Sequence, residues 1–234
     1  MQGGNSAFEG FGSRPAVVVT LHSGDLLRRA SGSAASLGGD LIEVRLDALA
    51  PQSEALAEHL PEIAKSIPLI LTARYPSEGG EGKLTWKTRR SLIDRFVEFA
   101  FAVDIEARSL DAAGGWLEEL RSAGMKLVVS HHDFEGLPEN GRIEEAVARA
   151  AESGADVAKL AYRLENPQHL SRLLRVFCAE KRLPLAAMGM GPMGRLSRLV
   201  FARCGSVLNY AHAGEANAPG QWEASRFRGL LGEL

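Results

Sequence analysis

The sequence contains little cysteine, and its two cysteines are not arranged as metal ligands. Cys178 and Cys204 are the two cysteines among 234 residues. Each falls within a predicted helix, and neither belongs to a CxxC or Cys/His spacing of the kind that binds a metal ion. We therefore expect no metal site built on thiolates, and we predict that both side chains are packed thiols in a reducing cytosol.

The chain also lacks an excess of charge of one sign. Its 27 Lys and Arg residues nearly balance its 29 Asp and Glu residues, so no one-signed field recruits nucleic acid or an anionic membrane. No apolar run reaches the roughly 18 residues that a membrane-spanning helix needs, and no basic segment followed by an apolar one opens the chain. We expect a cytoplasmic protein, neither secreted nor membrane-bound, whose partner is a small molecule.

What the chain does have is enough apolar sequence for one core. Hydrophobic residues make up 45% of it, and its length suits a single barrel-sized domain. Residues 1–12 are glycine-rich and without periodicity, so we predict a flexible N-terminal tail. Residues 13–234 are predicted to form one catalytic domain, since no interdomain linker interrupts them.

Short apolar runs alternate with helical segments along this domain. The eight predicted strands are Ala16 to Leu21, Leu41 to Arg45, Leu69 to Ala73, Ala102 to Glu106, Lys126 to Ser130, Asp156 to Leu160, Leu185 to Met188 and Ser206 to Tyr210. Their spacing suits a crossover helix between parallel neighbours. Ser53 is predicted to cap one such helix, and Asn166 with Pro167 to begin another. The pattern predicts an α/β fold, a closed (β/α)8 TIM barrel.

An open doubly wound sheet is the competing architecture, because it also alternates strands and helices. Such a sheet usually carries a glycine-rich phosphate turn after its first strand. Here the first strand continues into Leu21-His22-Ser23-Gly24, which is not GxGxxG. In a barrel the functional residues gather at the C-terminal ends of the strands, and the polar residues of this chain fall there.

Two predicted strands carry charged residues at alternate positions. The six residues are Glu43, Arg45 and Asp47 in one strand and Asp104, Glu106 and Arg108 in the other. The two-residue period of a strand places each set on one face. Because helices cover the outside of a barrel, we expect an internal polar network. The alternatives are ion pairs that only fill a layer of the barrel, or an outward face paired with helices.

Lys159 lies within a predicted strand, near its C-terminal end. Its neighbours in the sequence are small or apolar. Desolvation there disfavours the ammonium form, which is what a lysine nucleophile attacking a ketone requires. A solvent-exposed lysine is the ordinary alternative for a single Lys, but a mid-strand position in a barrel argues against it.

Two adjacent histidines, His131 and His132, end another predicted strand. Histidine is the commonest general acid or base, because it titrates near neutral pH. Adjacent side chains on a strand point in opposite directions, so we expect one of the two to face the barrel mouth. A metal site is the weaker alternative, since no third ligand at a recognisable spacing accompanies them.

Three loops complete the candidate site. Residues 74–80 contain a Gly pair that suits a closing loop. Residues 190–198 lead into a helix, and an arginine there can grip a carboxylate. A phosphate site or a solvated helix start fits that second loop equally well. Residues 218–222 form a turn that carries Gln221.

Taken together, these segments resemble the type I 3-dehydroquinate dehydratase family from about Pro15 to Trp222. The matching motifs are EVRLD at 43–47, TAR and EGG within 72–80, DIE at 104–106, SHHDF at 130–134, KLA at 159–161, MGPMGRLSR at 190–198 and APGQ at 218–221. The specificity lies in their ordered combination.

The resemblance implies a role for each matched residue. Lys159 is the Schiff-base lysine, His132 the general acid/base, and Glu78 the carboxylate beside that histidine. Six further positions match substrate-binding residues: Glu43, Arg45, Arg74, Arg198, Gln221 and Met190. Among them, Arg198 matches the residue that binds the substrate carboxylate, and Gln221 the loop residue that closes over the site.

The resemblance further implies dehydration of 3-dehydroquinate to 3-dehydroshikimate in the shikimate pathway, in a homodimer that needs no metal and no nucleotide cofactor. One departure is Asn217, where many members have Ser, and we expect a changed contact with retained activity. An aldolase that uses a lysine Schiff base on phosphorylated sugars remains an alternative, and it would hold phosphate near residues 191–194. A non-catalytic barrel that binds small acids is a second alternative.

Overall fold

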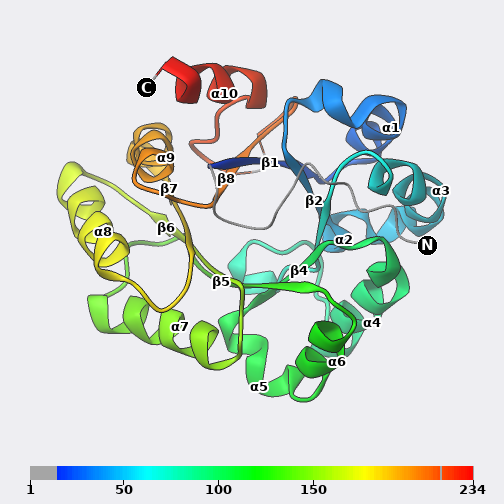
Figure 1. The fold of residues 1–234 in the computed structure, drawn as a ribbon, viewed down its shortest axis with the longest axis horizontal. Coiled ribbons are helices and arrows are strands. Elements are labelled where there is room, and N and C mark those ends of the chain that lie inside the picture. The colour runs from blue at the N-terminus through cyan, green and yellow to red at the C-terminus, as the bar shows by residue number, and fades with distance from the viewer. Residues whose placement is uncertain (1–14, 217, 234) are drawn as a thin grey trace.

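In the computed structural model, which describes residues 15–216 and 218–233, eight parallel strands form a nearly closed barrel with helices outside it (Figure 1). The strands are β1 (Ala16–Leu21), β2 (Leu41–Arg45), β3 (Leu69–Thr72), β4 (Ala102–Glu106), β5 (Lys126–Asp133), β6 (Val157–Arg163), β7 (Leu185–Met190) and β8 (Leu208–Ala211). The predicted (β/α)8 barrel is confirmed. The predicted tail, residues 1–12, and Asn217 lie outside the described residues.

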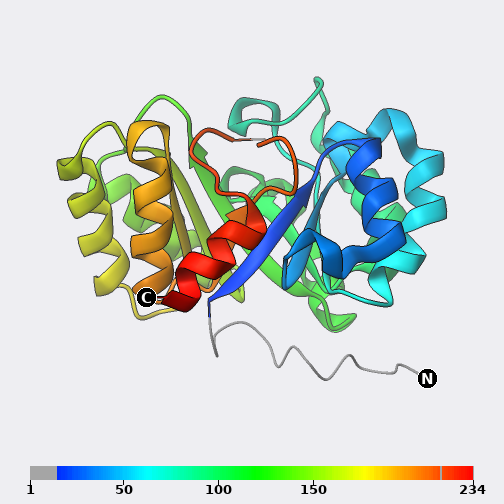
Figure 2. The same cartoon turned by 90° about the horizontal axis from the view of Figure 1, so that it is seen from above.

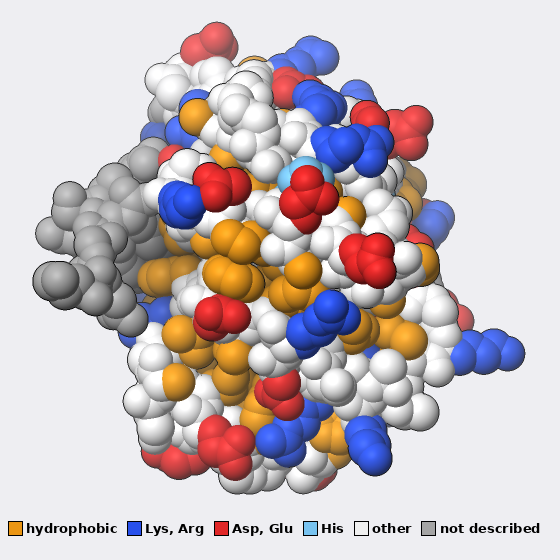
Figure 3. Space-filling model, turned by 90° about the vertical axis from the view of Figure 1, so that its right-hand side faces the viewer, with side chains coloured by type: hydrophobic (Ala, Val, Ile, Leu, Met, Phe, Trp, Pro, Cys, Tyr) orange, Lys and Arg blue, Asp and Glu red, His pale blue; other side chains and the backbone are white. Residues whose placement is uncertain are grey.

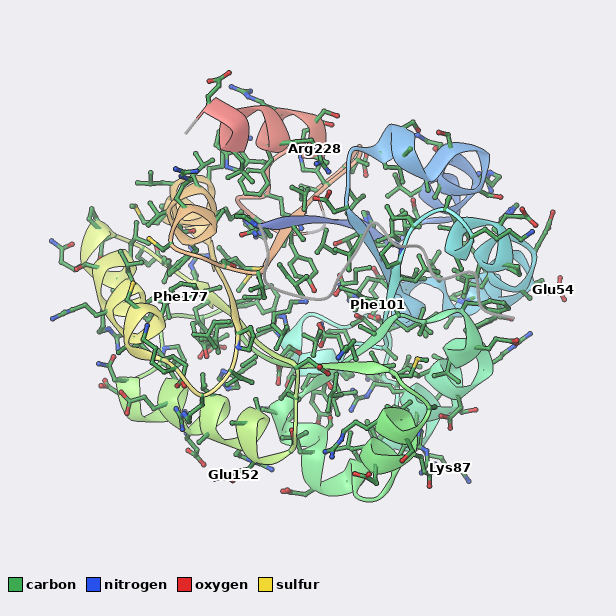
Figure 4. The ribbon with its side chains drawn as sticks, in the orientation of Figure 1. Glu54, Lys87, Phe101, Glu152, Phe177 and Arg228 are labelled. Carbon is green, nitrogen blue, oxygen red and sulfur yellow. The ribbon has the colours of Figure 1, made fainter. Side chains whose placement is uncertain are left out.

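Helices connect the strands and cover the outside of the barrel. The α-helices are α1 (Gly24–Ser33), α2 (Leu46–Leu49), α3 (Ser53–Ala64), α4 (Trp86–Phe96), α5 (Leu110–Ala113), α6 (Trp116–Ser122), α7 (Asn140–Glu152), α8 (Pro167–Ala179), α9 (Gly194–Arg203) and α10 (Ala224–Glu233). Short 3-10 turns are η1 (Ala34–Leu37), η2 (Ala50–Gln52), η3 (Pro76–Glu78), η4 (Val97–Phe99), η5 (Ala107–Ser109) and η6 (Gly191–Met193). Glu54, Lys87 and Glu152 on these helices project away from the barrel (Figure 4).

The barrel closes at a seam between β7 and β8, while β8 pairs with β1 in parallel register. At the seam the Val207 N–H donates to Leu185 O at 3.0 Å. The Ser206 hydroxyl oxygen accepts from the Ala187 N–H at 3.1 Å. A side chain here satisfies a backbone group that a longer ladder would otherwise pair.

The strands begin close to their predicted starts, but four of them end later than predicted, β8 by one residue, at Ala211. β5, β6 and β7 extend to Asp133, Arg163 and Met190. Ladder pairs such as His132 with Ala161 continue beyond the apolar runs. In β5, and at the end of β6, the apolar pattern stops where side chains become polar, whereas the hydrogen bonds of the ladder do not depend on side-chain polarity.

Alternation along the strands divides the core into two clusters. Val17, Val19 and Leu21 point toward the helices, whereas Val18 points into the barrel. The half of the interior where the strands begin is apolar, with Phe101 near the barrel axis (Figure 4). The other half, where the strands end, holds the buried polar side chains Thr20, Glu43, Thr72, Asp104, Ser130 and Lys159. This asymmetry places the polar site at one end of the barrel.

The predicted helix starts had different outcomes. Asn166 caps α8 by accepting from the His169 N–H at 2.9 Å, with Pro167 in the first turn, as predicted. The prediction for Ser53 is wrong, because Ser53 is already the first residue of α3 and makes no capping bond. The turn η2 runs directly into α3, so the backbone there continues from one turn into the next.

The two cysteines are exposed, so the prediction of packed thiols is wrong. Cys178 lies within α8, but Cys204 follows the last residue of α9. The faces of these helices that pack together carry Phe177 and Phe201 instead, with ring centroids 5.3 Å apart. An apolar helical pattern therefore identified the helices but not which side chains of each face inward.

The surface carries charges of both signs. Figure 3 shows Lys and Arg interspersed with Asp and Glu on the side of the molecule that includes α3 and α4, with apolar side chains between them. This distribution agrees with the near balance of charges in the sequence. Within the described ranges, no helix is long and apolar enough to cross a membrane.

Candidate active site

One cavity opens at the C-terminal ends of the strands, the end from which the loops after β3 and β8 project at the top of Figure 2. All nine residues predicted from the sequence line this cavity: Glu43, Arg45, Arg74, Glu78, His132, Lys159, Met190, Arg198 and Gln221. Their seven neighbours in the lining are Thr20, Gly79, Phe134, Ala161, Met188, Tyr210 and Ala218. Residues that are far apart in the sequence meet here because parallel strands all end at the same side of a barrel.

Lys159 is buried in the middle of this cavity floor, with 3% of its surface exposed. Its Nζ lies 2.9 Å from Asp104 Oδ2 and 3.1 Å from Glu43 Oε1. The same nitrogen lies 3.9 Å from the centroid of the Tyr210 ring. The small and apolar neighbours in the sequence are thus only part of its environment, because carboxylates from two other strands reach the amine.

Arg74 ties those carboxylates into a buried network. Its guanidinium donates to both oxygens of Asp104, at 3.1 and 2.8 Å, and to Glu106 Oε1 at 3.1 Å. The Ser130 hydroxyl donates to Asp104 Oδ1 at 2.6 Å. Burial alone would raise the pKa of Asp104, but the charges of Arg74 and Lys159 hold it well below its usual range. Asp104 is therefore an ionised partner for Lys159.

A second arginine supports this network from behind. Arg89 on α4 is buried, and its NH1 donates to Glu106 Oε2 at 2.6 Å while NH2 donates to Ser109 Oγ at 3.0 Å. Sequence reasoning missed this residue. In the sequence Arg89 lies among the polar residues of a surface helix. Nothing in that pattern predicts its contact with the Glu106 carboxylate of β4.

Arg45 and Asp47 form a pair at the edge of the cavity. Arg45 donates to both Asp47 oxygens, at 3.0 and 2.7 Å. Asp47 also accepts from the backbone N–H groups of Arg74 and Glu81, at 3.0 and 2.9 Å. The prediction that Asp47 belongs to a strand face is wrong, since β2 ends at Arg45 and Asp47 lies in α2. The pair nevertheless forms and ties the loop after β3 to the barrel.

Arg108 also lies beyond its predicted strand, in the turn η5. Its side chain is half exposed and folds over the loop after β3. There Nε lies 3.1 Å from Glu78 Oε1, and NH1 donates to Ser77 Oγ at 2.7 Å. The contact with Glu78 is an ion pair without hydrogen-bond alignment. Arg108 therefore acts on Glu78 mainly through its charge.

The two histidines point to opposite sides of β5, as the strand period predicts. His132 faces the cavity, and its backbone N–H and its Nδ1 lie 2.9 and 3.0 Å from Glu78 Oε2. His131 faces the helices, and its Nδ1 lies 2.9 Å from the Tyr162 hydroxyl. In the described part of the chain, His, Cys, Asp and Glu side chains do not gather in a group of three or more that could hold a metal ion.

The site tunes the His132–Glu78 pair for proton transfer. Burial lowers the pKa of His132 well below its usual value, and the positive charges of Arg74 and Lys159 lower it further. Burial also raises the pKa of Glu78 to about 7, against the opposing charge of Arg74. When Glu78 is ionised, it accepts the Nδ1–H of a neutral imidazole, which leaves the Nε2 lone pair free to act as a base.

Arg198 differs from the other cations of the site because no carboxylate of the described residues pairs with it. Its Nε donates to Gly220 O at 3.0 Å and its NH1 to Tyr210 O at 2.9 Å. Burial lowers its pKa to about 10. A buried cation bonded only to carbonyl groups is matched best by an anionic ligand.

The turn at 218–222 packs on the start of α9. The backbones of Gly194 and Gly220 touch, since a Cβ on Gly194 would lie 2.8 Å from Gly220 Cα. Gly220 has φ of +82°, a conformation that favours glycine. The contact covers the beginning of the helix, where the aldolase alternative would need an open phosphate cradle.

Sequence reasoning missed several polar groups that complete the floor. Thr20 and Thr72 donate to the two oxygens of Glu43 at 3.2 and 3.1 Å. Both threonines lie opposite residues of β2 in the strand register, Thr20 opposite Glu43 itself. Their alternation within each strand was visible in the sequence, but the register between strands was not.

Comparison with known proteins identifies the family. A family model described as type I 3-dehydroquinase matches residues 16–234. The chain belongs to this family. A 3-dehydroquinate dehydratase of Methanococcoides burtonii is 31% identical over 212 residues, which is 89% of each chain. Another, from Methanothrix thermoacetophila, is 34% identical over 207 residues, 88% of this chain and 86% of the relative.

Solved structures of type I 3-dehydroquinases share the barrel. The 3-dehydroquinate dehydratase of Geobacillus kaustophilus superposes with a TM-score of 0.82 at 26% identity, covering 95% of this chain and 91% of that one. A type I enzyme from Clostridium difficile, solved with covalently modified comenic acid, has the same TM-score and identity over 95% and 93%. The family resemblance predicted from the sequence is confirmed.

Proposed function

We propose that this type I 3-dehydroquinase family member dehydrates 3-dehydroquinate to 3-dehydroshikimate, the shikimate-pathway reaction, through a Schiff base on Lys159. The observation that carries the proposal is a buried lysine amine in the same cavity as a neutral, Glu78-bound His132. Relatives across the length of the barrel are named 3-dehydroquinate dehydratase. Lysine supplies the nucleophile and histidine the proton transfers that such a dehydration requires.

In the first stage the Lys159 nitrogen adds to the C3 ketone of the substrate. The ammonium first gives up one proton, the neutral amine adds to the ketone, and the protons lost by the nitrogen leave with the former ketone oxygen as water. The net products are a protonated imine and one water, so the step needs no outside proton. Glu43 and Asp104 lie 3.1 and 2.9 Å from the nitrogen and stabilise the cationic imine as they stabilise the ammonium. The imine then acts as an electron sink for the adjacent carbon.

In the second stage His132 serves as base and then as acid. Its Nε2 takes a proton from C2, the electrons form an enamine, and the imidazolium returns the proton to the departing C1 hydroxyl. One water leaves, and a second water hydrolyses the product imine and frees Lys159. Glu78 orients the ring by holding Nδ1 at 3.0 Å.

The remaining residues bind the substrate. Arg198 receives the carboxylate, because it is the buried cation that the described residues leave without a carboxylate. Glu43 and Arg45 face the substrate hydroxyls. Gln221 belongs to the loop that closes over the site, and Met190 forms an apolar wall.

We further propose that the catalytic domain spans residues 13–234, that the protein works as a cytoplasmic homodimer, and that it binds neither nucleic acid nor membrane.

Arg74 is best assigned to holding the charges of the floor. Its two terminal nitrogens already donate to Asp104, Glu106 and Ser130. A guanidinium so engaged has little left to offer a ligand. Its contribution to substrate binding is therefore electrostatic, through the carboxylate that faces Lys159.

Borohydride trapping tests the proposal directly. Reduction in the presence of 3-dehydroquinate is expected to add one ligand mass to the peptide that contains Lys159, measured by mass spectrometry. Lys126, which pairs with Asp156 at 2.9 Å outside the cavity, provides the matched control, and Lys126→Arg should label like the unmodified protein. Label on Lys126 would contradict the site assignment. No label and no turnover would favour the non-catalytic barrel.

A pH profile tests the role of Glu78. Because its pKa is raised to about 7 and the ionised form orients His132, kcat is expected to fall as the pH drops through neutrality. Arg108 lowers that pKa, so Arg108→Gln should move this acidic limb to higher pH by a fraction of a unit. The exposed Arg142→Gln, measured in parallel over pH 5.5 to 9, should leave the limb in place. An unmoved limb in Arg108→Gln would separate it from Glu78.

A further inference from the structure

Tyr210 lies at the centre of the site, although neither the sequence motifs nor the proposed mechanism uses it. It belongs to β8, is 3% exposed and points into the barrel, where it lines the cavity. Its ring faces the Lys159 Nζ at 3.9 Å. Its backbone carbonyl accepts from Arg198 NH1 at 2.9 Å. One residue thus touches both the proposed nucleophile and the proposed carboxylate-binding group.

The Tyr210 hydroxyl is buried and has no hydrogen-bond partner among the described residues. Buried hydroxyl groups are almost always paired, because burial removes their bonds to water. Tyr162 on β6 shows the usual arrangement, since its buried hydroxyl lies 2.9 Å from His131 Nδ1. A phenylalanine would fill the place of Tyr210 equally well without this cost, so the oxygen needs a hydrogen-bond partner, and the cavity that the Tyr210 side chain lines is where a ligand would supply one.

The hydroxyl is a donor under working conditions. Burial raises the pKa of Tyr210 well above its usual value, and the nearby charges of Glu43 and Asp104 raise it further. The phenol therefore keeps its proton at neutral pH. Glu43 already accepts hydrogen bonds from Thr20, Thr72 and Lys159. Asp104 accepts them from Lys159, Arg74 and Ser130. The Tyr210 hydroxyl is therefore available to donate to an oxygen of a bound molecule.

We infer that Tyr210 is a further substrate-binding residue, whose hydroxyl donates a hydrogen bond to an oxygen of the hydroxylated cyclic acid while its ring packs against the Lys159 nitrogen. The inference rests on the proposed function. It gives the site a means of selecting ligands that carry an oxygen at this point, because a ligand without it leaves the hydroxyl unpaired. The ring face also stabilises positive charge on the nitrogen, in the ammonium and in the imine.

Tyr210→Phe separates a ligand-binding role from a structural one. The variant keeps the ring and removes an oxygen that the free protein leaves unpaired, so the melting temperature without ligand should not fall. With 3-dehydroquinate, kcat/KM is expected to fall about 3- to 10-fold, the range for one neutral hydrogen bond. Steady-state rates and thermal melts, each on the same preparation, measure both quantities.

Tyr162→Phe is the matched control, because it removes a buried hydroxyl that is already paired outside the cavity. It should lower the melting temperature and leave kcat/KM within about twofold. A Tyr210→Phe variant that melts lower and turns over normally would overturn the inference while leaving the proposed function intact. Absence of turnover in the unmodified protein would instead overturn the proposed function, and the inference with it.

Discussion

Replacing His132 with Ala is expected to reduce kcat by about ten-thousandfold or more while adduct formation on Lys159 continues. General acid or base catalysis contributes about a hundredfold to ten-thousandfold, and here one imidazole would serve both proton transfers. The carbon–nitrogen bond between Lys159 and the substrate forms before either proton transfer by His132. Absorbance of dehydroshikimate measures turnover, and intact mass after borohydride measures the adduct.

His131→Ala is the control for this experiment, since the two histidines are adjacent and face opposite ways. His131 contacts Tyr162 away from the cavity, so its loss should reduce stability by about 1 to 3 kcal/mol by leaving that hydroxyl unpaired. Turnover should change little. A dead His131→Ala variant, or normal turnover in His132→Ala, would require a different acid/base.

Arg198→Ala is expected to lower kcat/KM by about 30-fold to several thousandfold, or roughly 2 to 5 kcal/mol for a lost charge-assisted contact in a desolvated site. The reason is that no carboxylate of the described residues pairs with Arg198. Arg45, Arg74 and Lys159 each have a carboxylate at hydrogen-bond distance, whereas Arg198 bonds two carbonyl groups. An anionic ligand therefore gains most from Arg198.

Arg195→Ala is the matched control, taken from the same helix turn. Arg195 is exposed and lies over the Trp222 ring at 5.2 Å, so its removal should change kcat/KM by less than about threefold. Arg198→Lys is a second variant in case Arg198→Ala fails to fold, because lysine keeps the positive charge and removes only the planar guanidinium with its paired donors. Equal losses in Arg195→Ala and Arg198→Ala would place the substrate carboxylate elsewhere.

The alternation of strands and helices was predictable because each strand of a parallel barrel is buried on both faces and reads as an apolar run. The ends of β5 and β6 were not, since their last residues, Asp133 and Arg163, are polar and continue the ladder only through backbone bonds. The end of β7 was missed for another reason, because Gly189 interrupts the apolar run before the buried Met190. Ser53 and the two cysteines were misjudged for a related reason. Local patterns identify a helix but not its first residue or its inward side chains.

The members of the site were predictable from ordered motifs, yet their pairing was not. The family motif assigned Arg198 to the substrate carboxylate, but the sequence did not show that Arg198 has no carboxylate among the described residues whereas Arg74 has two within 3.1 Å. Arg89 and Tyr210 belong to no motif, because their importance depends on which strands stand beside them. Such pairings are set by register and by side chains that cross the barrel.

The two carboxylates beside Lys159 have a consequence for the whole reaction. An ammonium and a protonated imine carry the same charge, and when the enamine becomes neutral the proton resides on His132. The lysine and histidine together therefore carry one positive charge from the resting state to product release. Glu43 and Asp104, at 3.1 and 2.9 Å from the nitrogen, face a cationic nitrogen in the ammonium and in both imines, and the positive charge that leaves it in the enamine stays in the same cavity on His132.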